Sequence, residues 1–195
     1  MATSPAVSPS SLLAGAAIKG IGVLGSGDAL HPEWRRTWEA FENNAGIVVL
    51  PTAEVEGKGR VHHLIIMEGF AQFAELHGSL APHSRDIATS GRPHVKLTGE
   101  AIAAVVHDLG GLIGPAHAFT PWTSLYAAHN SVASCYGEEP IDFLELGLSA
   151  RFVLRRRDPY RGAVPFGHEI CRPPGFTSRA YGGGAILLLR WSVSR

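Results

Sequence analysis

The stretch GLIGPAHAFTPWTSLY, residues 111–126, constrains the fold more than any other part of the chain. Its apolar run ends in a histidine, His117, and the chain then breaks into a turn at Pro121-Trp122. A buried barrel strand that delivers a ligand from its C-terminal end has this pattern. The segment therefore predicts a strand over residues 112–116 with a metal-ligating histidine just beyond it.

Three more apolar segments repeat this design. GIGVLGSGD ends at Asp28, with His31 three residues on, and GIVVLPTAE ends at Glu54. GRVHHLIIM carries His62 and His63 inside a strand, and because adjacent strand residues point to opposite faces, at most one of them should reach a shared site. Carboxylate and imidazole ligands suit Zn, Mn or Fe. The four strands together predict a polynuclear metal site.

Predicted strands and helices alternate along the chain, which favours an α/β fold with a parallel sheet or barrel. A hairpin turn is expected at residues 56–59, and Trp34 and Trp38 are expected in the core. Strands are expected at residues 21–27 (buried), 47–50, 61–67, 112–116 and 141–146. Helices are expected from a serine cap at residue 8 or 10 through 19, from 31 to a stop at 43–46, and at 70–80 and 98–109. A helix or a helix-turn is expected at 122–136.

The size of the chain and its cysteines limit the class of protein. One domain is the default for 195 residues, and a closed eight-unit barrel usually needs about 250. Cys135 and Cys171 lie far apart, so neither a disulfide framework nor a zinc finger is predicted. No apolar run is long enough for a membrane span and no signal-peptide pattern is present, which predicts a cytoplasmic location without membrane association.

Charge divides the chain into two unlike parts. Residues 1–150 hold eight basic and fifteen acidic residues, a net charge of −7. Residues 151–195 hold nine arginines, no lysine and two acidic residues, a net charge of +7. A basic tail of this kind binds nucleic acid phosphates, whereas an Arg-, Gly- and Pro-rich segment without clear periodicity is also what a shifted reading frame yields. We favour the out-of-frame interpretation and keep a disordered basic tail as the alternative.

Five segments stand in a compact order along residues 1–150. They are GSGDALHPEW (25–34), TAEVEGKGRVHHLIIM (52–67), SGRPHVKLTGE (90–100), GPAHAFTPWTSLY (114–126) and FLELGLSA (143–150). Together they resemble the PHP metallohydrolases, the polymerase and histidinol phosphatase superfamily, and within it the endonuclease Q-like branch. The resemblance implies a partial, distorted PHP-type (β/α) barrel with parallel strands. Residues 1–150 would then be an incomplete metallohydrolase domain, and residues 151–195 its basic tail.

The resemblance also implies a set of metal ligands. Glu54 and His117 match the family's glutamate and later histidine, and the family's Val-His-aliphatic pattern favours His62 over its neighbour. Asp28 matches the aspartate of the family's Thr-Asp-His, although Ala29 follows it here and His31 is the nearest substitute. A helix N-cap role would equally explain either of these two residues. An intact family member holds two or three divalent ions, Zn, Mn or Fe.

Trp122 is a separate candidate, for substrate binding. It lies beside the His117 loop, where an aromatic side chain can stack on an extruded base. Core packing is the alternative for this residue.

Two motifs of the family are absent from the sequence. No His-x-His pair and no Ser-Asp-x-His segment occurs in it. We therefore expect Met1 to be an internal methionine read as a start, with the missing strand encoded upstream. The second motif would lie out of frame with the tail.

The function implied by the resemblance is metal-dependent phosphodiester hydrolysis. Bound divalent ions generate hydroxide near neutral pH and neutralise a phosphate, which phosphoryl transfer requires. Endonuclease Q-like members nick DNA next to deaminated or abasic bases in DNA repair, so DNA is the expected partner. A PHP-type small-molecule phosphatase is one alternative. A truncated, inactive remnant is the other, because two metal motifs are missing.

Overall fold

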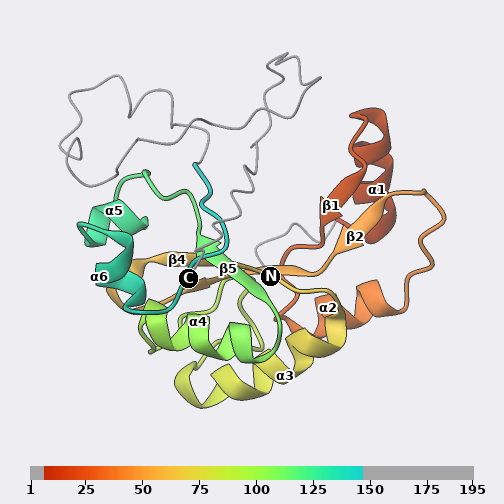
Figure 1. Ribbon diagram of the computed structural model, residues 1–195. Coiled ribbons are helices and arrows are strands. Elements are labelled where there is room, and N and C mark those ends of the chain that lie inside the picture. Colours follow the sequence, from red (N-terminus) through yellow and green to blue (C-terminus); the bar gives the residue numbers. More distant parts are fainter. Residues whose placement is uncertain (1–6, 147–195) are drawn as a thin grey trace.

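A computed structural model describes residues 7–146 of the chain (Figure 1). Its strands form a two-stranded parallel sheet and a three-stranded antiparallel sheet in the order β3-β4-β5. Their bounds are β1 Val23–Gly25, β2 Val48–Leu50, β3 Thr52–Glu56, β4 His62–Ile66 and β5 Leu112–Pro115. The basic tail predicted at residues 151–195 lies outside the described residues.

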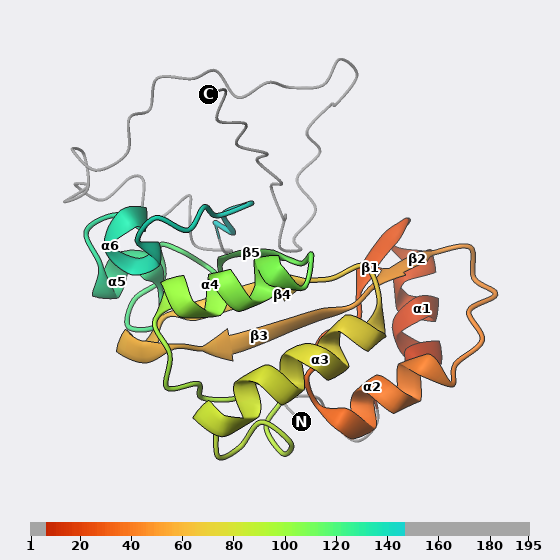
Figure 2. The same cartoon turned by 60° about the horizontal axis from the view of Figure 1, so that its bottom comes forward.

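The helices lie around the two sheets (Figure 2). α3 and α4 run along one face of the antiparallel sheet, whereas α5 and α6 lie at its far end from β1 and β2 (Figures 1 and 2). Within residues 7–146 no helix combines the length and the apolar character needed to cross a bilayer. The α-helices are α1 Pro9–Ile18, α2 Pro32–Glu39, α3 Phe70–Leu80, α4 Gly99–Asp108, α5 Leu125–Ala128 and α6 Val132–Tyr136, and short 3-10 turns span Lys58–Arg60 and Ala81–His83.

Local capping signals fix several helix ends where the sequence predicts them. Ser8 caps α1 by accepting a hydrogen bond from the backbone of Ser11, and Gly20 follows the helix with φ +67°. Thr98 caps α4 in the same way through Ala101. The predicted helices at 8–19, 70–80 and 98–109 are confirmed to within one or two residues.

The parallel pair β1–β2 forms a small unit with α1 and α2. Trp34 and Trp38 are buried in it and their rings meet edge to face, which confirms their predicted place in the core. The expected burial of the first strand is wrong, because Ile21 is 37% and Val23 56% exposed. Among the described residues, α1 and α2 cover one face of the β1–β2 sheet, the face that carries Leu24 and Val49.

The expected parallel order is wrong for the larger sheet. β3 and β4 pair antiparallel, as do β4 and β5. A connection of a few residues joins β3 to β4. It is closed by a hydrogen bond from Gly57 N–H to the Val61 carbonyl. A parallel crossover needs a dozen residues or more, so the predicted hairpin at 56–59, which is confirmed, itself requires an antiparallel pair. No barrel is formed by residues 7–146.

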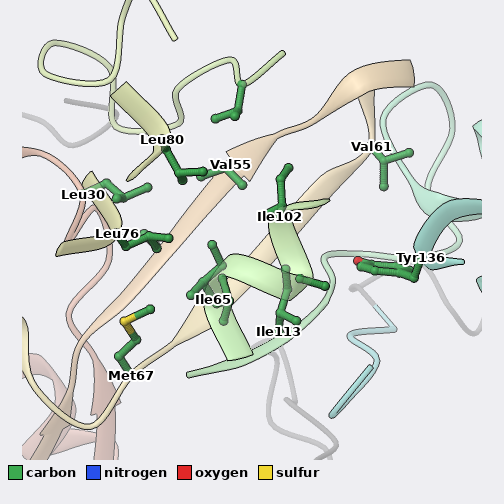
Figure 3. Close-up of a cluster of buried hydrophobic side chains, with 14 of the residues drawn as sticks. Leu30, Val55, Val61, Ile65, Met67, Leu76, Leu80, Ile102, Ile113 and Tyr136 are labelled. Carbon is green, nitrogen blue, oxygen red and sulfur yellow. The ribbon is translucent and has the colours of Figure 1, made fainter. Parts of the chain in front are cut away.

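The main core lies between the antiparallel sheet and helices α3 and α4 (Figure 3). Along β3, Ala53 and Val55 are buried toward this core, whereas Glu54 and Glu56 point to the other face. On β4, Ile65 faces the core with Val55 close by (Figure 3). The carboxylates of β3 therefore stand on the face of the sheet that α3 and α4 leave uncovered.

The strand predicted at residues 141–146 is also wrong. The segment runs beside β5, where Asp142 N–H donates to the Ile113 carbonyl and Glu145 N–H donates to the Pro115 carbonyl. These two bonds do not extend into a regular strand pairing, so residues 141–146 form no β-strand. The segment nevertheless packs tightly, since a methyl group on Gly114 would collide with the backbone of Phe143.

Substitution of Gly114 by alanine tests this close approach. The added methyl group would meet the Phe143 carbonyl oxygen, so we expect Gly114→Ala to lower the free energy of unfolding by about 2 kcal/mol or more. The control is Gly78→Ala in the interior of α3, where a methyl group meets no atom within 4 Å. That change should stabilise the protein by about 0.5–1 kcal/mol through helix propensity. Urea unfolding measures both, and equal effects of the two substitutions would contradict the packing described.

Candidate metal centre

Three side chains from three segments converge on the face of the antiparallel sheet opposite α3 and α4. Glu54 Oε1 lies 2.8 Å from His62 Nδ1 and 3.5 Å from His117 Nε2, and the two nitrogens are 3.0 Å apart. Within residues 7–146 this is the one group of His, Cys, Asp and Glu side chains whose geometry could hold a metal ion. The structure thus brings together three of the five predicted ligands.

The three atoms fit a metal ion by both chemistry and spacing. Bonds of about 2.0–2.1 Å to a tetrahedral zinc ion leave neighbouring ligand atoms about 3.3 Å apart, close to the observed 2.8–3.5 Å. Two histidines and one glutamate, with a fourth position open, form a ligand set found in catalytic zinc sites. The same donors also accommodate Mn or Fe.

Strand register places two of these ligands. Glu56 pairs directly with His62 across the β3–β4 hairpin, and Glu54 pairs with Leu64. Directly paired residues point to the same face, so Glu54 and His62 are diagonal neighbours on that face. His62 is 3% exposed, which holds its ring in one position against the sheet.

His117 reaches the group through a strained backbone. Its φ of +33° is rarely adopted by residues other than glycine and turns the chain sharply after β5. Its N–H donates to a Glu145 carboxylate oxygen at 2.9 Å, and its Nδ1 lies 2.8 Å from the Thr120 hydroxyl. Because the Thr120 hydroxyl also donates to the His117 carbonyl, it accepts from Nδ1–H and leaves the Nε2 lone pair directed at the group.

Electrostatics favour a cation between the three side chains. Burial raises the pKa of Glu54, but hydrogen bonds with His117 and His62 outweigh it and hold that pKa well below its ordinary value. The hydrogen bond with Glu54 raises the pKa of His117, against the opposing effect of burial. Glu54 is therefore ionised at neutral pH, and the three converging lone pairs are stabilised by a proton or by a metal ion.

His63 has a different environment from its neighbour. It is fully buried on the core face, where its Nδ1 lies 2.7 Å from the Tyr136 hydroxyl. Burial lowers the pKa of His63 to about 3, so its imidazole is neutral. The structure thus directs the two adjacent histidines to opposite faces, as the strand pattern predicts.

Asp28 and His31 do not join the group. Both residues lie in the segment that follows β1. A hydrogen bond from Ala29 N–H to the Thr52 carbonyl ties this segment to the start of β3. His31 occupies the N-cap position of α2 but makes no side-chain cap bond there, so the helix-cap explanation fails for this residue. Asp28 Oδ2 and His31 Nδ1 are both buried without a hydrogen-bond partner, and burial lowers the pKa of His31.

Trp122 lies on the loop that follows His117. It is 80% exposed and has a φ of +74°, so the core-packing alternative is wrong. The loop returns to the site directly after it, because the Thr123 carbonyl accepts a hydrogen bond from His62 N–H at 3.2 Å. The loop that carries Trp122 therefore begins at His117 and is tied to the backbone of His62 at its far end.

Sequence reasoning missed several polar residues around the group. Glu56, two residues beyond Glu54 on the same strand face, lies 3.3 Å from His62 Nε2, and Arg92 lies 3.4 Å from Glu54. The alternation of strand faces could have revealed Glu56. Contacts of Arg92 and Thr120 depend on loop conformations, for which the sequence carried no signal.

Comparison with known proteins gives relatives for this chain. No protein-family model matches the sequence. The chain is 39% identical over 108 residues to the uncharacterized protein MJ0043 of Methanocaldococcus jannaschii. The matched region covers 55% of this chain and 13% of that relative. It is 34% identical over 93 residues to the uncharacterized protein YqxK of Bacillus subtilis, covering 47% of the chain and 24% of that relative.

Two solved structures are similar to the fold. One is the lesion-specific endonuclease PfuEndoQ from Pyrococcus furiosus, with a TM-score of 0.72 and 42% identity over 76% of this chain. The other is endonuclease Q bound to a 27-mer duplex with an abasic lesion at the active site, with the same TM-score, identity and coverage of this chain. This chain is related to endonuclease Q. It spans 39% and 40% of those two endonuclease Q chains.

Removal of one imidazole tests whether Glu54, His62 and His117, from here on called the trio, bind a metal ion in this endonuclease Q-like chain. We expect His117→Ala to weaken zinc binding by about 100-fold or more, because even changes in residues that only orient ligands cost about 10–100-fold. The control is His107→Ala, whose ring lies between Glu139 (2.9 Å) and Asp142 (3.2 Å) but outside the trio. Competition with a chromogenic chelator measures the affinity. Equal zinc affinity in the two variants would rule out the proposed ligand set.

Proposed function

We propose that this chain carries part of a metal-dependent phosphodiesterase that, like endonuclease Q, nicks DNA next to deaminated or abasic bases in repair. One observation carries the proposal: a glutamate and two histidines with metal-ligand geometry occur in a chain related to endonuclease Q. A related endonuclease Q structure holds duplex DNA with an abasic lesion at its active site, which supports DNA as the partner.

Glu54 Oε1, His62 Nδ1 and His117 Nε2 would hold a divalent ion, Zn, Mn or Fe. Such an ion supplies a hydroxide nucleophile near neutral pH and stabilises charge on the phosphate. Asp28 and His31 are proposed as ligands of a further ion of the two or three in an intact family member. Their buried, unpartnered polar atoms support that role, since such atoms are costly unless a ligand satisfies them.

The charges of the trio suit an anionic substrate. Glu54 contributes one negative charge, and the two histidines bind as neutral rings. A divalent ion in this site therefore keeps a net positive charge, which attracts a phosphodiester. The Thr120 hydroxyl accepts the Nδ1–H of His117 and so orients the ring. The Nε2 lone pair of His117 then stays directed at the site while substrate enters.

Trp122 is proposed to contact a base of the DNA. An exposed indole on a strained backbone beside the metal group is poorly explained by folding stability, and strain of this kind gathers at functional sites. Stacking of a base on an aromatic side chain contributes about 1–3 kcal/mol and tolerates any sequence.

Nicking of a defined DNA duplex tests the function. With Zn or Mn added, we expect the 195-residue chain to cut a duplex that holds one abasic or deaminated nucleotide, and not an undamaged duplex. His117→Ala should abolish cutting, whereas His107→Ala should leave it unchanged. Hydrolysis of a small phosphomonoester without any cutting of DNA would instead identify a phosphatase. Tight metal binding with neither activity would overturn the catalytic proposal.

Trp122→Ala separates substrate binding from catalysis. Loss of one stacked base should weaken DNA binding by about 10-fold or more and leave zinc affinity unchanged. Trp122→Phe keeps an aromatic face and should retain most of the affinity. Fluorescence anisotropy with a labelled abasic duplex measures both, and equal DNA affinity in wild type and Trp122→Ala would exclude the stacking role.

A further inference from the structure

Glu56 is the second carboxylate that faces His62. It pairs directly with His62 across the hairpin, and its Oε2 lies 3.3 Å from His62 Nε2. Its side chain is only 12% exposed. His62 thus stands between two glutamates of one strand, with Nδ1 toward Glu54 and Nε2 toward Glu56.

The two nitrogens of His62 have different tasks at a metal site. A neutral imidazole carries one proton, so one nitrogen donates a hydrogen bond and the other offers a lone pair. Nδ1 is the atom that lies near Glu54 and His117, and it must be the one without the proton when it binds a metal. The proton then resides on Nε2, which points at the Glu56 carboxylate.

Further contacts hold Glu56 in place. Its N–H donates to the Pro93 carbonyl at 2.9 Å, and its own carbonyl accepts from Val95 N–H at 2.8 Å. His94 Nε2 lies 3.4 Å from Oε2, and His94 is itself anchored by Asp86 through both its N–H (3.0 Å) and its ring Nδ1 (3.1 Å). Arg60 is 71% exposed and 4.0 Å away, so its contact is weaker.

We propose that Glu56 is a positioning residue of the metal site, which accepts the Nε2–H of His62 and thereby presents Nδ1 as a ligand. The proposal rests on metal binding by the trio, as proposed above. Partners of this kind, which bond the second nitrogen of a ligating histidine, fix the ring and its tautomer, and their loss costs about 10–100-fold in metal affinity.

A hydrogen-bond role can be separated from a mere effect of charge. Glu56→Ala removes both the acceptor and the charge. Glu56→Gln removes the charge but keeps a carbonyl oxygen that can accept from Nε2–H. Glu68→Ala, at an exposed position, is the control for the loss of one negative charge.

The experiment measures zinc affinity and the His62 proton in the 195-residue chain. Chelator competition gives the dissociation constant for each variant. Long-range ¹H–¹⁵N spectra of the zinc-loaded protein, with the His62 signals assigned by substitution, report which ring nitrogen carries the proton. We expect Nε2–H in wild type, a 10–100-fold loss of zinc affinity in Glu56→Ala, a loss below about 10-fold in Glu56→Gln, and wild-type affinity in Glu68→Ala.

Each outcome decides the proposal. Wild-type zinc affinity in Glu56→Ala, or a His62 ring bound to zinc through Nε2, would overturn the role of Glu56 while leaving the metal site intact. Equal losses of zinc affinity in the alanine and glutamine variants would mean that Glu56 acts only through its negative charge. That result would also overturn the proposed hydrogen-bond role. No zinc binding by the wild-type chain would overturn the metal site itself and the proposal with it. Should Glu56→Ala fail to fold, a His62 ring bound to zinc through Nε2, or a loss of about 10-fold or more in Glu56→Gln, would still overturn the proposal.

Discussion

The hydrogen-bonded pairing of β3 with β4 fixes the positions of two ligands of the candidate metal centre, Glu54 and His62, and of Glu56 beside them. It sets Glu56 opposite His62 and Glu54 diagonal to it, on the face that α3 and α4 leave uncovered. A shift of the register by one residue would turn His62 into the core and His63 outward. The buried contacts of His63 with Tyr136, and of Val55 and Ile65 with the helices, hold the register in place. Packing on one face of the sheet therefore determines chemistry on the other.

The third ligand is delivered by a loop rather than by a strand. His117 leaves β5 with a positive φ, and the loop is tied back to β4 where the Thr123 carbonyl meets His62 N–H. Backbone strain at two of its residues is balanced by contacts of this kind. The same loop presents Trp122 to solvent, so that a metal ligand and a candidate base contact share one rigid connection.

Agreement between sequence and structure follows the range of the interactions. Helix ends at Ser8 and Thr98 depend on bonds three residues apart, and the sequence predicts them. The burial of β1 and the strand at 141–146 depend on what packs against them, and both predictions are wrong. The parallel order is wrong for a similar reason, because apolar runs alternating with helices do not reveal that β4 returns along β3 and pairs with β5.

The sequence by itself determined which residues could serve as ligands and which turns the backbone could make. Glu54, His62 and His117 were candidates because each residue type stands within or just after an apolar strand, and the glycines around residue 57 required a hairpin. Only the tertiary structure decided that these three converge, that Asp28 and His31 stand apart, and that Glu56 faces the second nitrogen of His62. The physical reason is that ligand geometry arises between strands and loops distant in sequence, where register and packing act and local pattern does not.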